Sequence, residues 1–271
     1  MDSISILTLN IDSHPLDRKT RIDGVVSLLT AHSPDIVFLQ ETMSQDNSSD
    51  ASSYIANAAN LTLASQSGIG TAILSKFPVL ESFSSSIKGS ISHPSATFAK
   101  VQVGKHVALT CSAHLSWGSG MEVERLYQAQ EIDAVFASYG ALEPFRKGGS
   151  GILGFFGGDL NSLPDSATLR WLQGLSVENN LSTHWTDSWV RGIGPGITSD
   201  PNNPLAARTA LTGNLAIWPE APLPSRRIDY ILSRGYAYGR PGAPLKAEII
   251  DSSPNGTFPS DHYALLATFS L

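Results

Sequence analysis

The chain has 271 residues and 41 % of them are hydrophobic, so it can bury a large core, and no long linker divides it into two halves. We therefore expect a single α/β domain over residues 1–271. Eighteen Lys and Arg against 24 Asp and Glu give a net charge of −6. This balance excludes a global positive field that would attract nucleic acid or an anionic membrane, so a nucleic-acid partner would need a local basic surface.

Cysteine content and hydropathy indicate where the protein resides. Cys111 is the one cysteine, which excludes a disulfide within the chain, and its apolar setting predicts a buried structural thiol. The first residues lack the positive start and apolar stretch of a signal peptide, and no run reaches the ~20 apolar residues of a membrane span. We expect a soluble intracellular protein, cytoplasmic or nuclear, with no obligate protein partner, unless an upstream segment precedes this sequence.

The first 60 residues predict a strand–helix–strand opening and a further short helix. Residues 4–9 form an apolar run of the kind that suits a strand. Within Arg18–His32 the apolar residues recur at i, i+3, i+4 and i+7, which is typical of a helix that packs on a sheet, and Pro34 ends it. Residues 36–39 have the pattern of a buried strand, and residues 51–60 predict a weaker helix.

The middle of the chain predicts paired strands and one long helix. Residues 71–74 are strand-like. Residues 96–103 and 107–111 are also strand-like and are separated by a Gly104-Lys105 turn, so antiparallel pairing is expected between these two. Residues 121–139 carry one apolar helical face and give the strongest helix prediction in the sequence.

The second half predicts three more strands, at residues 152–156, 228–232 and 263–269, and a helix over 166–173 with Asp165 as its N-cap. Between Arg191 and Arg227 lie 37 residues with six Pro and four Gly and little periodicity. Four Arg against Asp200 and Glu220 give this segment a local charge of +2. Loops of this length are usually functional or disordered, so the segment is either a substrate contact or a mobile surface insertion.

Four polar clusters lie directly beside the apolar strand-like runs and indicate one divided catalytic site. They are Asn10 with Asp12, Glu41, Asp159 with Asn161, and Asp261 with His262. Carboxylates brought together in this way repel one another unless a bound cation neutralises them. Oxygen and amide ligands of this kind suit Mg²⁺ or Mn²⁺.

Six motifs carry a resemblance that covers nearly the whole chain. They are Thr8-Leu9-Asn10-Ile11-Asp12, Leu39-Gln40-Glu41, His114-Leu115, Gly158-Asp159-Leu160-Asn161, Arg227-Ile228-Asp229-Tyr230 and Ser260-Asp261-His262. In order and spacing they resemble the endonuclease/exonuclease/phosphatase superfamily. The resemblance implies the DNase I-like fold, a four-layer α/β sandwich of two packed mixed β-sheets flanked by helices. It also implies Mg²⁺-dependent hydrolysis of phosphate esters.

For the metal side of the site, the resemblance implies that Glu41 is the direct ligand. Asn10 can offer its amide oxygen to the metal or a metal-bound water, while its NH₂ reaches a phosphate oxygen. Asp12 matches an acidic position that contributes to the metal side in DNA-repair members, although it can also cap the turn before Arg18. Asp261 would complete the metal or water shell.

For the phosphate side, the resemblance makes Asp159 a proton acceptor for the attacking water and Asn161 a holder of the phosphate or that water. An Asx turn capping the next helix is an alternative that can hold at the same time. His262 would form a dyad with Asp229 and stabilise charge on the phosphate. Whether Asp159 or His262 is the base stays open. His114 would bind phosphate or protonate the leaving oxygen.

The substrate is less determined than the reaction. The motifs look most like the branch with tyrosyl-DNA phosphodiesterase type 2 and the abasic-site endonucleases, which favours nucleic-acid 5′ ends, although Leu9 stands where DNA-processing members usually carry Trp. The alternatives are a phosphodiesterase or phosphatase for a small molecule or lipid headgroup, and a non-catalytic binding relative. Arg125 is expected to brace the site. Candidates for substrate contact are Arg125, Arg191, Arg208, Arg226 and Trp218.

Overall fold

Two six-stranded mixed sheets form the centre of the computed structural model, which describes residues 3–46, 49–67, 70–88, 95–118, 120–141, 151–206, 224–234 and 240–271. The first sheet has the order β11 (Pro244–Ile250), β12 (Ala264–Ser270), β1 (Ser3–Asn10), β2 (Ile36–Gln40), β4 (Thr71–Ser75) and β3 (Thr62–Gln66). The second has the order β5 (Val79–Ser86), β6 (Ser95–Val103), β7 (His106–His114), β8 (Leu153–Asp159), β10 (Asp229–Ser233) and β9 (Thr186–Asp187). A 3₁₀ turn, η1 (Ser188–Arg191), follows β9.

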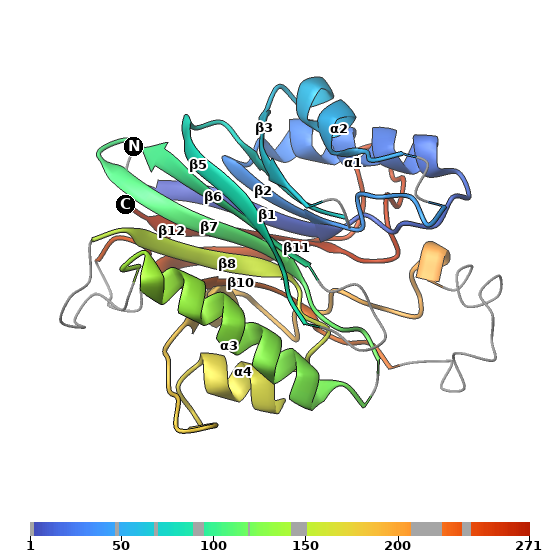
Figure 1. Ribbon diagram of the computed structural model, residues 1–271. Coiled ribbons are helices and arrows are strands. Elements are labelled where there is room, and N and C mark those ends of the chain that lie inside the picture. Colours follow the sequence, from blue (N-terminus) through green and yellow to red (C-terminus); the bar gives the residue numbers. More distant parts are fainter. Residues whose placement is uncertain are drawn as a thin grey trace.

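Helices cover the outer face of each sheet, which completes four layers (Figure 1). Helices α1 (Arg18–His32) and α2 (Ser52–Ala58) lie on the first sheet. Helices α3 (Glu122–Ser138) and α4 (Ala167–Leu172) lie on the second. The predicted α/β sandwich is confirmed. The first and last strands pair, with Ser3 opposite Ser270.

Three apolar clusters fill the spaces between the layers. One lies between the sheets and includes Phe38, Phe155 and Phe269, all fully buried. The second joins α1 and α2 to the first sheet, and the third joins α3 and α4 to the second. Strands β2 and β4 are buried on both faces, so they read as largely continuous apolar runs rather than as alternating ones.

Strand alternation explains why the polar residues of the motifs meet. Ile6 of β1 and Phe155 of β8 point into the space between the sheets, and side chains two residues apart share a face. By this rule Asn10, His114, Asp159 and Asp229 all sit on the inner faces, at the ends of β1, β7, β8 and the start of β10. The strand register places His114 and Asp229 directly opposite Asp159 on either side.

Gly158 permits β8 to run close beside β7 just before Asp159. Its φ is +134°, and a Cβ at this position would lie 1.9 Å from the carbonyl oxygen of Ala113. No side chain fits there, so the glycine in the Gly158-Asp159 motif is a steric requirement of the sheet that carries the site.

Most predicted elements are confirmed, with α1 matching to the residue and α3 within one residue at each end. Strands β3, β5, β9 and β11 were not predicted because they lie toward the sheet edges, where polar residues interrupt the apolar runs. The predicted N-cap at Asp165 is wrong. The Oγ atom of Ser166 accepts the bond from the Leu169 amide and caps α4 instead.

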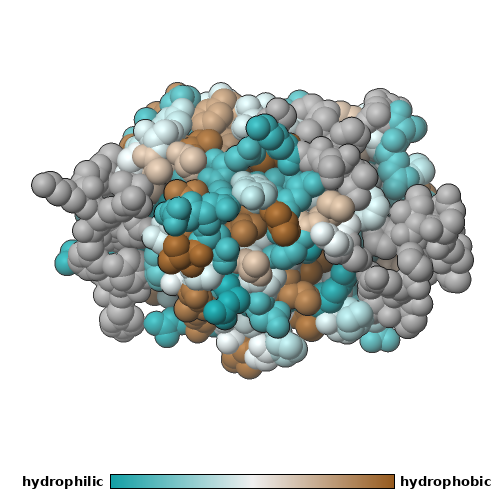
Figure 2. Space-filling model, turned by 60° about the horizontal axis from the view of Figure 1, so that its bottom comes forward, coloured by the Kyte–Doolittle hydropathy of each residue, from teal (hydrophilic) through white to brown (hydrophobic). Residues whose placement is uncertain are grey.

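Figure 2 shows the molecule from the side of α3 and α4, where apolar side chains are interrupted by hydrophilic ones. Exposed apolar residues in this part of the chain include Val123, Tyr127, Leu175 and Val177. Within the described ranges, no helix has the length and apolar character needed to cross a membrane.

Candidate active site

Asn10 connects the two sheets at the centre of the site. Its Nδ2 donates to Oε1 of Glu41 at 2.9 Å and to Oδ2 of Asp159 at 3.1 Å. Its Oδ1 accepts the Asp12 backbone amide at 3.0 Å. The amide oxygen therefore has one partner within the loop, and the NH₂ group holds two carboxylates; the predicted role of this oxygen toward a metal or a metal-bound water stays a prediction.

Glu41 follows directly after β2 in a left-handed backbone conformation, with φ +57°. Its Oε2 accepts the Ser13 amide at 2.8 Å. Burial alone would raise the pKa of Glu41, but the charge of His114 and the hydrogen bonds from Asn10 and Ser13 outweigh it and lower the pKa to about 2. Glu41 is thus a fixed carboxylate anion at neutral pH.

Asp12 forms the turn that its sequence position allowed, and its role on the metal side stays a prediction. Its Oδ1 accepts the His14 amide at 2.8 Å, which forms the turn, and its Oδ2 lies 3.1 Å from a guanidinium nitrogen of Arg21. Burial and the charge of Asp261 raise the pKa of Asp12 to about 6, although Arg21 opposes the shift. Burial and the charge of Glu41 also raise the pKa of Asp261, against the attraction of His262.

These three carboxylates, Asp12, Glu41 and Asp261, are named the acid cluster here. The negative charge of Glu41 disfavours the ionisation of Asp12 and Asp261, which is the electrostatic condition that a divalent cation relieves. Asp12 already pairs with the Arg21 guanidinium, whereas the hydrogen bonds to Glu41 come from neutral amides, so Glu41 is the better direct ligand and Asp12 and Asp261 would add negative charge around it. Mg²⁺ usually keeps several waters and takes one or two carboxylates, so these residues fit it.

His262 and Asp229 form the predicted pair. His262 Nδ1 lies 2.9 Å from Asp229 Oδ2, and its Nε2 lies 3.9 Å from Asp159 Oδ2. Burial of the ring would lower the pKa of His262, but the charge and hydrogen bond of Asp229, with the charges of Asp159 and Asp261, raise it well above its usual value. These partners favour the protonated ring, whose Nε2 faces Asp159.

Asp159 receives groups from strands β1 and β7 and from the segment before β12. Besides Asn10 and His262, His114 Nε2 lies 3.5 Å from its Oδ2 and 4.0 Å from Glu41 Oε1. The Oδ1 atom accepts the Asn161 amide at 2.9 Å, so the Asx turn exists, but it does not cap α4. Asn161 itself donates to the Leu115 carbonyl at 3.1 Å. We name His114, Asp159, Asp229 and His262 the histidine cluster.

A second place for an ion lies within the histidine cluster. Asp159, Asp229 and His262 have donor atoms within 4.8 Å of one another. However, the bond between His262 and Asp229 already uses one atom of each, and the cationic ring disfavours a metal there. The acid cluster, where burial and mutual repulsion raise the pKa values of Asp12 and Asp261 despite Arg21 and His262, is the better site.

The long segment after Arg191 supplies two positioning residues that sequence reasoning missed. Thr198 Oγ1 accepts the amides of Ile228 and Asp229, and Asn203 Nδ2 donates to the Ser260 carbonyl. Both side chains are fully buried. The segment has no periodicity, so no local signal could have marked them.

The structure separates the predicted substrate contacts. Arg125 is buried and its guanidinium binds Glu122 and two backbone carbonyls, so it braces the loop and does not reach substrate. Arg191 bonds to the carbonyl of Pro244, which pairs with Phe269 at the end of the sheet opposite the site, so that prediction is wrong.

The remaining predicted contacts differ in how far they can be placed. Arg226 lies near the site, because Ser199 bridges to both Arg226 and His262. Arg208 and Trp218 lie outside the described residues.

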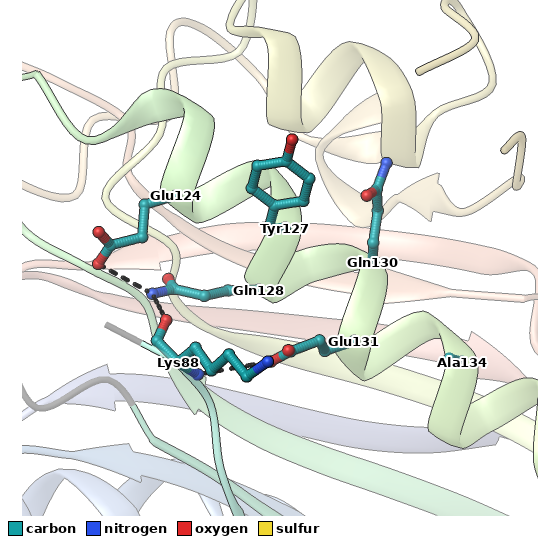
Figure 3. A pocket seen from close by; sticks show the side chains of 7 residues that line it. All are labelled: Lys88, Glu124, Tyr127, Gln128, Gln130, Glu131 and Ala134. Carbon is teal, nitrogen blue, oxygen red and sulfur yellow. Dashed lines mark hydrogen bonds between the residues drawn. The ribbon is translucent and has the colours of Figure 1, made fainter. Parts of the chain in front are cut away.

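A pocket of about 620 Å³ lies along α3 rather than over the acid cluster (Figure 3). Its lining residues are Lys88, Glu124, Tyr127, Gln128, Gln130, Glu131 and Ala134.

An acid cluster joined through Asn10 to a His–Asp pair, at one end of a DNase I-like sandwich, defines a hydrolytic phosphoesterase. The chain belongs to the endonuclease/exonuclease/phosphatase family, whose model matches residues 7–262. Metal dependence is typical of that family. No curated protein sequence matches the chain.

Solved structures share the fold at low sequence identity. Humanized D. rerio TDP2 is 21 % identical with a TM-score of 0.71, and 99 % of each chain is covered. D. rerio TDP2 in complex with a single-strand DNA product is 21 % identical with a TM-score of 0.70, again with 99 % of each chain covered. A family protein from Bacteroides vulgatus is 17 % identical with a TM-score of 0.70, with both chains covered completely.

Proposed function

We propose that the protein is a phosphodiesterase that hydrolyses esters at nucleic-acid 5′ ends, with Mg²⁺ or Mn²⁺ as cofactor. The observation that carries this proposal is the arrangement around Asn10, which holds Glu41 and Asp159 on two sheets within one hydrogen-bonded group. The structural similarity to a TDP2 crystallised with a single-strand DNA product supports a nucleic-acid substrate.

In this mechanism the acid cluster holds the cation. Glu41 is the direct ligand, and Asp12 and Asp261 add negative charge around it. The cation, when bound, neutralises phosphoryl oxygens and the leaving oxygen as negative charge develops on them.

The histidine cluster positions the phosphate and the attacking water. His262 keeps its Nδ1 on Asp229, so its Nε2 is the atom that can donate to a phosphoryl oxygen. A cationic imidazole cannot accept a proton, which leaves Asp159 as the acceptor for the proton of the attacking water. His114, beside the same carboxylate oxygen, is placed to donate to the phosphate or the leaving oxygen.

The test is hydrolysis of a single-stranded oligonucleotide that carries a 5′-phosphotyrosyl group, with Mg²⁺ and with EDTA. We expect Mg²⁺-dependent release of tyrosine. Activity on bis-p-nitrophenyl phosphate without activity on any DNA or RNA end would refute the nucleic-acid substrate but retain the phosphoesterase. Inactivity on all diesters and monoesters would refute the catalytic assignment.

One observation favours a small-molecule or lipid-headgroup substrate as the second candidate. Four arginines near the site already bond to protein partners, so these guanidinium groups do not serve a nucleic-acid backbone: Arg18, Arg21, Arg125 and Arg227. Substrate affinity that falls steeply between low and moderate salt supports nucleic acid, since counterion release makes such binding salt-sensitive. A flat salt response supports the small molecule.

A further inference from the structure

The loop that follows His114 carries a partly exposed tryptophan three residues farther along the chain. Trp117 is 37 % exposed and belongs to none of the three apolar clusters described above. The other tryptophans in the described ranges serve the core, with Trp171 and Trp185 1 % exposed and Trp189 partly buried against the cluster between the sheets. Trp117 is therefore the most exposed indole in the described ranges.

Helix α3 holds the backbone on both sides of this tryptophan. One guanidinium nitrogen of Arg125 donates to the carbonyls of Ser116 and Gly118, at 2.9 and 2.8 Å. Gln128 accepts the Ser116 amide at 3.1 Å and donates to the Ser116 hydroxyl at 2.7 Å. That hydroxyl donates to Glu124 at 2.6 Å. Figure 3 shows the Gln128 amide also bonded to the Lys88 carbonyl, which fixes it from a second direction.

A second set of bonds ties the same loop to the reacting groups. Leu115 donates its amide to the Asp159 carbonyl, and its own carbonyl accepts from Asn161. Trp117 lies two residues beyond Leu115 and three beyond His114, so its backbone is at most about 10 Å from that of His114. A nucleotide or a phenyl ester whose phosphate sits at Asp159 and His114 can span this distance.

We propose that Trp117 is a stacking platform for an aromatic ring attached to the scissile phosphate, and that Arg125 and Gln128 position it. This inference rests on the proposed function and extends it to substrate selection. The ring has two sources with the same chemistry, the terminal nucleobase or a phenolic leaving group, and both present a flat π-face to the indole.

The test compares Trp117→Ala and Trp117→Phe with wild type on four single-stranded oligonucleotides. The 5′-phosphate ester carries either tyrosine or hexyl alcohol, and the terminal nucleotide carries either thymine or no base. Tyr54→Ala is the matched control, because Tyr54 is 51 % exposed on α2, away from the site. Thermal unfolding of each variant reports on the fold.

We expect Trp117→Ala to raise KM about 5- to 100-fold on a ring-bearing substrate with kcat nearly unchanged, because the loss of one base–aromatic stacking contact weakens binding by a factor of this size. Trp117→Phe should recover most of the loss. If KM rises only on the substrates that carry thymine, the stacked ring is the nucleobase. If KM rises only on the substrates that carry tyrosine, the stacked ring is the leaving group.

The proposal is overturned if Trp117→Ala matches wild type on all substrates, or if it loses as much on the hexyl ester without a base. Wild-type inactivity on all four oligonucleotides is a different result: it refutes the proposed function and, with it, this extension. Wild-type activity with an unaffected variant refutes the stacking platform alone.

Discussion

The acid cluster and the histidine cluster lie side by side but are stabilised in opposite ways. In the acid cluster, Asp12 and Asp261 have raised pKa values because negative charges are buried together. In the histidine cluster, the imidazole of His262 lies between Asp229 and Asp159, so opposite charges are paired. The first therefore keeps negative charge that Arg21 balances only in part, whereas in the second the imidazole balances the carboxylates.

This difference separates two kinds of effect. Changes in the histidine cluster should act on the chemical step with little effect on metal binding. Changes in the acid cluster should act on metal binding and on the stability of the metal-free protein. Asn10 bonds to both clusters, so their different roles arise from the chemistry of their side chains and not from the distance between them.

The largest effect is expected for Asp159→Asn. The amide keeps the hydrogen bond from Asn161 but cannot accept a proton, so kcat should fall about 10³-fold while the unfolding midpoint changes little. Steady-state kinetics with Mg²⁺ in excess measure this. Asp165→Asn, an exposed residue of the same loop, is the control and should retain full activity. Normal turnover by Asp159→Asn would remove Asp159 as the base.

Asp229→Asn should have the next largest effect. The loss of the negative partner lowers the pKa of His262, because the charge and hydrogen bond of Asp229 are what raise it. The His262 proton should therefore be lost at a lower pH, and kcat should fall about 10²-fold near neutrality. Titration of the histidine ring protons by NMR measures the shift. An unchanged His262 pKa would show that the pair does not hold the cation.

The acid cluster predicts a pH-dependent cost in the metal-free protein. The pKa of Asp12 is about 6 when folded against 3.8 ordinarily, so its contribution to stability is present below 3.8 and is lost as the pH rises through 6. Asp12→Asn should therefore stabilise the metal-free protein at about pH 7.5 by roughly 2 kcal/mol, but not near pH 4. Urea unfolding with EDTA at both pH values tests this. An equal difference at the two values would contradict it.

The smallest effect is expected for Thr198→Val, which keeps the shape of the side chain but removes the acceptor for the amides of Ile228 and Asp229. Leaving these buried donors without Oγ1 should cost about 1–2 kcal/mol of stability and lower kcat a few-fold through Asp229. Thr30→Val on the exposed face of α1 is the control. A Thr198→Val protein as stable and active as wild type would contradict the positioning role.

The elements and residues that could be predicted are those marked by a pattern in the adjacent sequence. The apolar periodicity of α1 and α3 and the inner strands β1, β2, β8 and β12 were predictable, and so were the polar residues that follow them. Thr198 could not be found this way, because its role depends on contacts across a segment without periodicity. Arg191 was misassigned for the same reason, since only the sheet register reveals that it lies at the far end from the site.

The choice between amide oxygen and amide nitrogen at Asn10 also lay beyond the sequence. The residue type permits either atom to face the carboxylates. The Asp12 amide decides the orientation, because it occupies the oxygen and turns the NH₂ group toward Glu41 and Asp159.

Calorimetric titration of Mg²⁺ into wild type, Glu41→Gln and Asp229→Asn tests most directly that the cation belongs to the acid cluster. We predict that Asp229→Asn binds Mg²⁺ with nearly wild-type affinity, whereas Glu41→Gln shows no binding. The opposite result, loss in Asp229→Asn with binding retained in Glu41→Gln, would place the ion among Asp159, Asp229 and His262 and contradict the division of the site.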